Sequence, residues 1–293
     1  MKPSQMRDIK RSMIRGFIVF FIVIGILGYI LLNTVYIEPF KELEREDALQ
    51  TVESVRNEID YRLNEVLISA ADWGVWDETY LYTQGLNTNY IESNLVDDTF
   101  DSLNFDICII ADDSGNVLYG KQIDFETDEL KVIDQSVSKM LKASGILENK
   151  DTETYFNDIL LIDGSPYLIG AYPIIRTSGR GPVKGQFIFG KILDDNMMDE
   201  MSDKLNLKVS FELLTKSDFD QLSELSEEGI EILSKNENYI LGNYYITGIF
   251  EEYYTKISIE IPRNVMKVGL KSLILSISLY TFCSRMFELR NTL

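Results

Sequence analysis

An uncharged apolar run near the N-terminus constrains the fold of this chain more than any other feature. Residues 16–32 read GFIVFFIVIGILGYILL, and Ile14 and Val35 can extend the run. A helix needs about 20 mostly apolar residues to cross a lipid bilayer. We therefore predict a transmembrane helix at residues 16–36.

Secretory signal peptides share this layout, but their apolar region is shorter and ends in small residues at a cleavage site. Residues 31–34 read LLNT and contain no such site, so we predict an uncleaved signal anchor. Residues 1–15 carry several basic side chains, and basic flanks stay inside the cell. We expect residues 1–15 in the cytoplasm and residues 37–264 in the extracellular or periplasmic space.

A second apolar run spans residues 265–283 and is interrupted by Lys267 and Lys271. Both lysines can extend their ammonium groups to the outer membrane surface. We predict a second transmembrane helix here, followed by a short cytoplasmic tail at 284–293. A soluble or surface helix is the alternative.

The charge balance excludes several functions. The chain has 28 basic and 47 acidic residues, a net charge of −19, and no histidine. The acidic excess lies between basic ends, in residues 34–264, and argues against nucleic-acid binding, which needs a basic face. Solubility alone would also explain it. Without histidine, Ser-His-Asp and Cys-His nucleophiles and imidazole metal ligands are excluded.

Neither a disulfide nor a metal site is predicted. Cys108 and Cys283 are expected on opposite sides of the membrane boundary, so a disulfide between them is not expected. Each is most simply interpreted as a small core residue. Residues 112–116 read DDSGN, but the spacing does not match a calcium-binding EF-hand loop. We predict a turn there, and no cofactor.

Residues 40–82 have the pattern of one long stalk helix. Apolar residues recur at spacings of three and four along a narrow seam: Val52, Val55, Ile59, Leu63, Val66 and Ala70. Such a helix would be about 60 Å long. That length favours pairing with a second copy of the chain. The alternative is one helix packed along its own domain.

The rest of the body has an α+β pattern in two units. In residues 83–193 we predict strands at 103–111 and 117–121, a helix at 128–141, and strands at 155–162, 167–175 and 186–193. This order favours an antiparallel sheet with helices on one side, covered by the stalk. Residues 194–264 form a smaller α/β unit, with a helix at 194–205, a strand at 207–213, acidic helices within 217–233 and a hairpin at 238–261.

The most conspicuous cluster of functional residue types is DWGVWDETYLY at residues 72–82. If the helix is continuous, one face carries Asp72, Trp73, Trp76, Asp77 and Tyr80, because successive residues turn by about 100°. Two interpretations stay open: a core-facing stripe, or the wall of a ligand pocket. A pocket of this composition would suit a small cation or amine, through cation–π attraction and an ion pair.

Short motifs within residues 40–264 carry a family resemblance. They are DWGVWDETY at 72–80, LNFD at 103–106, DSGNVLYGK at 113–121, GPVKG at 181–185, GKILD at 190–194 and IPR at 261–263. With an apolar run on each side, this set resembles the class-four CHASE domain, an extracellular sensor attached to histidine kinases and nucleotide cyclases. The resemblance implies a PAS-like or Cache-like sensor, usually dimeric, and adds Tyr119 to the ligand-binding candidates.

The resemblance implies a membrane-anchored sensory module that binds an unidentified small molecule and forms a homodimer through its stalk and membrane helices. Members of the family continue into a signal-relay segment and a catalytic domain, which this sequence does not display. We therefore expect a separate kinase or full-length receptor as partner. The alternative is a truncated receptor remnant or an interaction subunit.

An exported enzyme is the least favoured reading. Asp72 and Asp77 could in principle act as an acid/base pair. The sequence has no nucleophile elbow or phosphate-binding loop. We predict no catalytic residue.

Overall fold

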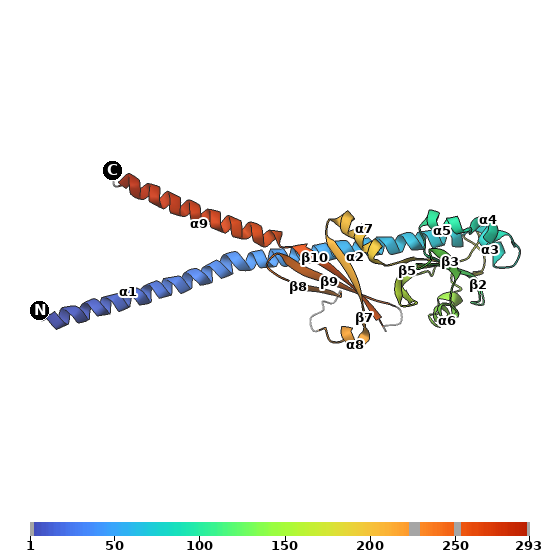
Figure 1. Cartoon of the computed structure of the whole chain (residues 1–293), viewed down its shortest axis with the longest axis horizontal. Coiled ribbons are helices and arrows are strands. Elements are labelled where there is room, and N and C mark those ends of the chain that lie inside the picture. The colour runs from blue at the N-terminus through green and yellow to red at the C-terminus, as the bar shows by residue number, and fades with distance from the viewer. Residues whose placement is uncertain (1–2, 223–228, 249–252, 292–293) are drawn as a thin grey trace. The chain divides into compact units, whose positions relative to one another are not determined.

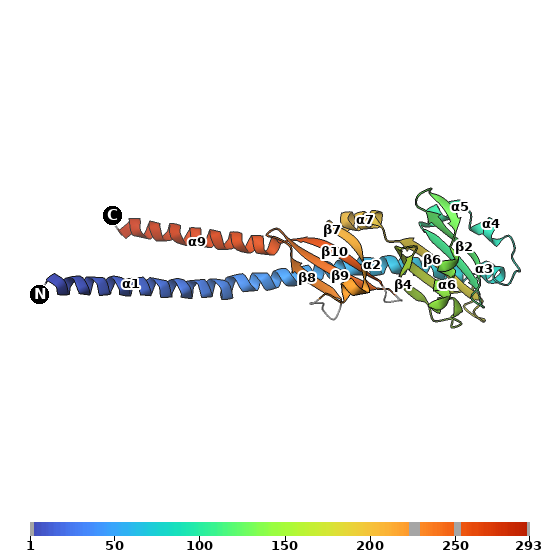
Figure 2. The ribbon, with the colours of Figure 1, turned by 60° about the horizontal axis from the view of Figure 1, so that its bottom comes forward.

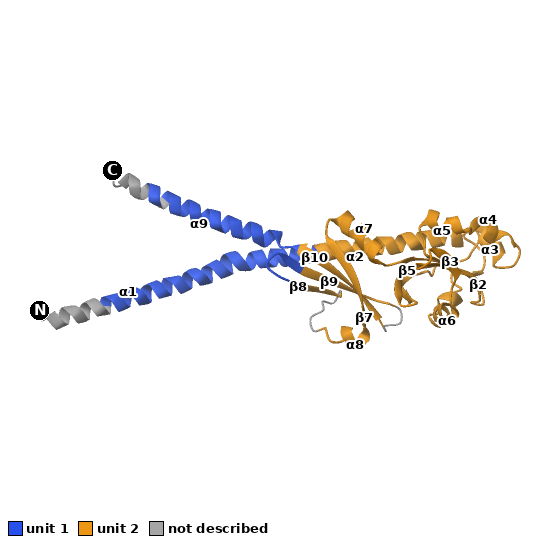
Figure 3. Ribbon diagram, in the orientation of Figure 1, with its two compact units in different colours: residues 1–50, 234–240, 262–293 blue, residues 51–233, 241–261 orange. Residues whose placement is uncertain are grey.

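The structure is a computed structural model that describes residues 3–222, 229–248 and 253–291. The chain divides into two compact units, which Figure 3 distinguishes by colour. Unit 1 comprises residues 1–50, 234–240 and 262–293. Unit 2 comprises residues 51–233 and 241–261, and contains most of both sheets.

Unit 1 contains the apolar helices. It holds α1 (Pro3–Leu31), a π-helical segment η1 (Leu32–Ile37), the beginning of α2 (Glu38–Gly74), and α9 (Asn264–Asn291) (Figure 1). By length and composition, the helical stretch Met13–Gly74 and the helix Asn264–Cys283 are each able to cross a membrane. Most of the large apolar side chains in these two stretches are exposed. In a membrane, such side chains would contact the lipid.

The chain stays helical through Pro39. Pro39 lies in the first turn of α2, directly after the π-helical residues. Proline has no N–H to donate, and a wider π-helical turn changes which carbonyl each N–H would reach. The chain therefore continues helically from α1 into α2.

The predicted continuous helix over residues 40–82 is interrupted. α2 ends at Gly74, Val75 forms a parallel bridge with Ile175, and Trp76 has extended backbone angles (φ −139°, ψ 131°). A second helix, α3 (Asp77–Tyr82), then begins. The cause is tertiary, because the Ile175 amide donates a hydrogen bond to the Gly74 carbonyl.

The first sheet lies in unit 2 and is antiparallel throughout, as predicted. Its strand order is β3-β2-β1-β6-β5-β4, and Figure 2 labels β2, β6 and β4 of this sheet. The strands are β1 (Ile107–Asp112), β2 (Val117–Asp124), β3 (Glu129–Val132), β4 (Phe156–Ile162), β5 (Ser165–Pro173) and β6 (Gly185–Ile192). The predicted turn joins β1 to β2, where the Asp112 carboxylate accepts hydrogen bonds from the amides of Ser114 and Asn116.

Helices cover both faces of this sheet rather than one. One face forms a buried core with α6 (Gln135–Ala143) and the short 3-10 helix η2 (Ile146–Glu148). The other face meets α2 so closely that a Cβ at Gly170 would lie 2.6 Å from the Leu67 Cα. Nearly every residue of β1 and β6 is buried, so both faces need an apolar partner.

The helix predicted at 128–141 is also divided. Its first residues form the edge strand β3, and α6 begins only after Asp134, whose side chain caps it by accepting the Ser136 amide. Two short helices, α4 (Tyr90–Asn94) and α5 (Asp97–Leu103), lie between α3 and β1, so the strand predicted at 103–111 begins only at Ile107. Both precede β1 and lie in unit 2.

The second sheet has the order β7-β10-β9-β8. Its strands are β7 (Lys208–Thr215), β8 (Ile230–Ser234), β9 (Tyr239–Thr247) and β10 (Tyr253–Pro262), with α7 (Asp195–Leu205) before β7 and α8 (Lys216–Phe219) after it. The predicted hairpin is present as β9 and β10, although residues 249–252 lie outside the described residues. Of the acidic helices predicted within 217–233, residues 223–228 lie outside the described chain, and Ile230–Ser234 is a strand.

The apolar seam of α2 packs on the chain's own sheets. Val52, Val55 and Ile59 are at most 1% exposed. A Cβ at Gly242 of β9 would clash with a Val52 methyl group. The seam therefore follows the alternative of a helix packed along its own domain, and is not free to pair with a second copy.

Candidate ligand-binding site

The two tryptophans that were predicted as ligand contacts form an aromatic cluster with the first sheet. The ring of Trp73 lies 5.8 Å from that of Phe187 and 5.9 Å from that of Phe189, both on β6. Trp76 contacts Trp73 at 5.8 Å and Tyr90 at 5.9 Å between ring centroids. The cluster fastens the end of α2 to the sheet, although the tryptophans do not share one helical face as predicted, because the helix breaks between them.

The other members of that block have separate surroundings. Asp72 is exposed on the last turn of α2. Asp77 and Thr177 exchange two hydrogen bonds, one in each direction, that join α3 to the loop after β5. Tyr80 is 3% exposed, and the guanidinium of Arg176 lies 4.7 Å from its ring centroid. The cation over this aromatic ring is therefore one of the chain's own side chains.

Tyr119 lies on β2 and is buried. Its hydroxyl group has no hydrogen-bond partner within the described residues, and burial raises its pKa. Tyr90, also buried, shares a 2.8 Å hydrogen bond with Thr79. Ligand contact by the six residues selected from the sequence, Asp72, Trp73, Trp76, Asp77, Tyr80 and Tyr119, stays a prediction.

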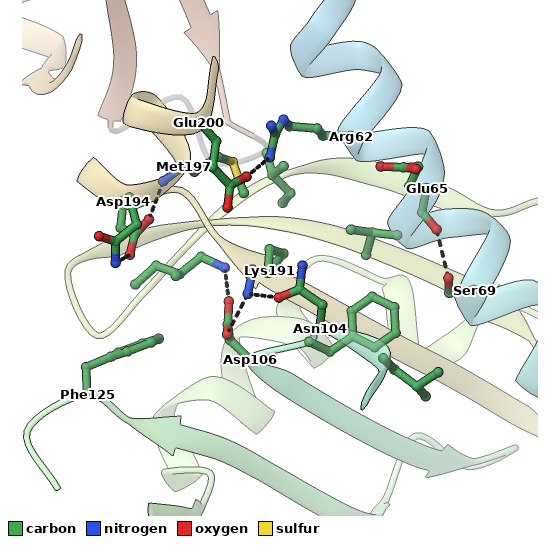
Figure 4. A pocket seen from close by; sticks show the side chains of 16 residues that line it. Arg62, Glu65, Ser69, Asn104, Asp106, Phe125, Lys191, Asp194, Met197 and Glu200 are labelled. Atoms are coloured by element: carbon green, nitrogen blue, oxygen red, sulfur yellow. Dashed lines mark hydrogen bonds and ion pairs between the residues drawn. The ribbon is translucent and has the colours of Figure 1, made fainter. Parts of the chain in front are cut away.

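A cavity of about 510 Å³ lies elsewhere in unit 2, against the middle of α2. One wall is the α2 face that carries Arg62, Glu65, Val66 and Ser69. The remaining walls come from residues 103–106, Phe125, Leu168, the end of β6 and the first turns of α7 (Figure 4). Apolar and polar groups converge here, as they do in small-molecule sites of this size.

An ion pair between a half-buried lysine and a buried aspartate lines this cavity. The Lys191 ammonium lies 3.1 Å from an Asp106 carboxylate oxygen and donates a 2.8 Å hydrogen bond to Asn104 (Figure 4). The second Asp106 oxygen accepts the Ile192 amide at 2.7 Å. Burial raises the pKa of Asp106, and the hydrogen bonds from Ile192 and Lys191 offset this only in part. Both charges are thus satisfied within the chain.

A second charged network joins α2 to α7. Arg62 donates to Glu200 at 3.0 Å and to the buried Glu58 at 3.1 Å. Lys204 also contacts Glu58. The Tyr61 hydroxyl donates to Glu65 at 2.7 Å. These contacts fix the orientation of the polar side chains on two walls of the cavity.

None of the cavity residues was among the predicted ligand contacts, yet the sequence contained a signal for them. Two of the motifs that carried the family resemblance, residues 103–106 and 190–194, meet at this cavity and contribute Asp106, Lys191 and Asp194. Those motifs lie far apart in the sequence, and only the pairing of β1 with β6 brings them together. Within the described residues, no group of three or more acidic or cysteine side chains is arranged to hold a metal ion.

Comparison with known proteins places the fold in a class. The CHASE4 domain family matches residues 59–212, just over half of the chain. The α+β body, with its long N-terminal helix and antiparallel sheets, is thus a sensory module of signal-transduction receptors. The chain belongs to the CHASE4 domain family. The match is narrower than the residues 40–264 over which the motifs are spread.

Individual relatives share little sequence with the chain. The methanogenesis regulatory histidine kinase FilI of Methanothrix harundinacea is 21% identical over 234 residues, which is 79% of this chain and 26% of the kinase. The chain thus spans about a quarter of that relative. Among solved structures, the periplasmic domain of Vibrio cholerae LuxQ has a TM-score of 0.45 at 15% identity, covering 73% of this chain and 99% of that domain. The sensory domain of the Campylobacter jejuni chemoreceptor Tlp1 has a TM-score of 0.44 at 13% identity, covering 78% and 98%.

Proposed function

We propose that this chain is the extracellular sensing part of a membrane receptor, and that a small molecule in the cavity beside α2 is its stimulus. The observation that carries the proposal is the position of the cavity. Its wall is the α2 face around Arg62, Glu65 and Ser69, and the same helix continues to Glu38, beside the first apolar helix. A ligand in this cavity would therefore contact the element that leads to the membrane.

A ligand changes the balance between two states of a receptor only if it binds them with different affinity. Contacts with α2 provide such a difference when the helix tilts, slides or rotates between the states. In unit 1, the beginning of α2 is joined to the beginning of α9 by the ion pair of Glu44 with Arg263. A displacement of α2 would thereby be passed to both apolar helices.

The membrane topology is part of the proposal. The basic residues that precede the apolar run favour a cytoplasmic N-terminus, and a second span by α9 would return the chain to the cytoplasm. The resemblance of 79% of the chain to a histidine kinase supports a kinase as the output, carried by a partner or a longer form of the protein. Because the α2 seam is buried, a homodimer would use the apolar helices or another face of α2.

Fusion of residues 1–293 to the relay segment and kinase domain of a known receptor kinase tests the sensing role without knowledge of the ligand. Ser69→Trp places a large ring in the cavity, whereas Asn57→Trp adds the same ring on an exposed part of α2. The proposal predicts that Ser69→Trp changes kinase autophosphorylation in membranes several-fold, while Asn57→Trp matches the wild type. Equal output from all three, at equal expression, contradicts it.

A further inference from the structure

We propose that the cavity beside α2 takes a small organic cation, an amine attached to a short apolar chain; this inference rests on the proposed sensing function and names its ligand class. The cavity holds four carboxylates and two basic groups. The carboxylates are those of Glu65, Asp106, Asp194 and Glu200, and the basic groups are those of Arg62 and Lys191.

The two basic groups are not available to an anion. Lys191 is paired with Asp106, and Arg62 is shared by Glu58 and Glu200. A ligand carboxylate or phosphate would have to displace one of these partners, and a displaced Asp106 or Glu58 carboxylate would be left buried without its counter-charge, which is unfavourable. The cavity therefore disfavours anionic ligands.

Carboxylate oxygens remain available to a cation. Glu65 accepts a hydrogen bond from the Tyr61 hydroxyl with one oxygen and has no ion pair among the residues described. Glu200 uses one oxygen for Arg62. Asp194 accepts the Met197 amide at 2.9 Å with one oxygen and the Asn196 side-chain amide at 3.2 Å with the other, and it has no basic partner in the described structure. An ammonium group has three donors and would satisfy such acceptors.

The remaining walls suit an apolar chain. Phe105, Leu168 and Met197 are buried residues that line the cavity, and Phe125, which is 53% exposed, also lines it. An aromatic face also attracts a cation. The volume of about 510 Å³ falls in the lower half of the range for small-molecule sites, about 300–1,000 Å³. The net charge of −19 would raise the local concentration of cations at low salt.

The test uses the whole chain in detergent and four probes of matched length: n-butylamine, 1,4-diaminobutane, butanoate and 1-butanol. Calorimetric titration is expected to show binding of the two amines and not of butanoate or butanol. Glu65→Gln is an isosteric substitution at an exposed position that removes one negative charge. It should weaken amine binding about tenfold, as expected for loss of a close charge pair. Glu92→Gln, an exposed acid on α4, should leave it unchanged.

The possible outcomes separate this inference from the sensing function. If butanoate binds and Ser69→Trp abolishes its binding, the cavity is a ligand site but the cationic class is wrong. If the amines bind Glu65→Gln as tightly as the wild type, they bind elsewhere, and the inference is overturned. If none of the four probes binds, the inference is overturned as well, while the sensing function is decided by the kinase fusion alone.

Discussion

Arg263 binds one carboxylate oxygen of Glu44 with two of its guanidinium nitrogens, each at 2.9 Å. The other Glu44 oxygen accepts the Met266 amide at 3.3 Å, and Arg263 also donates to the Asn236 carbonyl. Glu44 is 4% exposed. Within unit 1, this pair fixes the beginning of α2 to the beginning of α9, and a Cβ at Gly269 would lie 2.7 Å from the Phe40 ring.

Glu44→Gln is expected to destabilise the chain strongly. The substitution leaves the guanidinium of Arg263 partly buried without its counter-charge, which costs about 3 kcal/mol, the lower limit for removing one partner of a buried pair. Glu46→Gln, at an exposed position of the same helix, should change stability by less than about 0.5 kcal/mol. Denaturant unfolding of residues 1–293 in micelles measures both, and similar stability of the two variants would contradict the role of the pair.

Substitution of Trp73 distinguishes packing from ligand contact. Trp73→Ala removes a ring that packs on Phe187 and Phe189 and should cost about 3–5 kcal/mol. Trp73→Phe keeps an aromatic ring and should leave amine affinity within about twofold of the wild type, since Trp73 does not line the cavity. A large loss of affinity in Trp73→Phe, with the fold intact, would instead support the pocket-wall interpretation of residues 72–82.

Tyr119→Phe should leave stability unchanged or raise it slightly. The variant removes a buried hydroxyl group that lacks a hydrogen-bond partner in the described structure, and removing an unsatisfied group is not costly. Tyr90→Phe is the matched control, because it breaks the 2.8 Å bond to Thr79 and should cost about 1–3 kcal/mol. Thermal unfolding of both variants tests the contrast. Equal destabilisation by both would indicate that the Tyr119 hydroxyl has a partner.

Asp106 should make stability depend on pH. Its pKa in the folded state is raised above the ordinary value of 3.8, chiefly by burial. The folded state therefore binds a proton more readily than the unfolded state, and the contribution of this group is present below pH 3.8 and is lost as pH rises through the raised pKa.

Asp106→Asn removes this dependence. The unfolding free energy of the variant minus that of the wild type should consequently increase as pH rises from about 3.8, because the charged wild-type carboxylate is penalised by burial. Urea unfolding at several pH values gives the difference directly. A difference that falls over that range would mean that pairing with Lys191 outweighs burial.

Local patterns predicted much of the fold. Short apolar segments separated by turn residues located β4, β5 and β6, and alternation located the hairpin of β9 and β10. The Asp-rich turn between β1 and β2 closes through its own side chain at Asp112. The antiparallel sheet and the α+β class follow from such short-range signals.

Features that depend on distant contacts were not predictable in this way. The break at Val75 depends on Ile175, and β3 is a polar edge strand that resembles the beginning of a helix. The seam of α2 could face a second copy or the chain's own sheets, and the burial of Val52 against β9 at Gly242 decides between them. The cavity draws its walls from several segments, so single-segment patterns do not reveal it.

The most direct test of the account is hydrogen–deuterium exchange of residues 1–293 with and without saturating 1,4-diaminobutane. The account predicts slower exchange in peptides that cover 62–69, 103–106 and 191–200, the segments around the cavity, and little change in 72–90. Slower exchange confined to 72–90 and the strand that carries Tyr119, with none at 62–69, would contradict it and place the ligand at the tryptophan cluster.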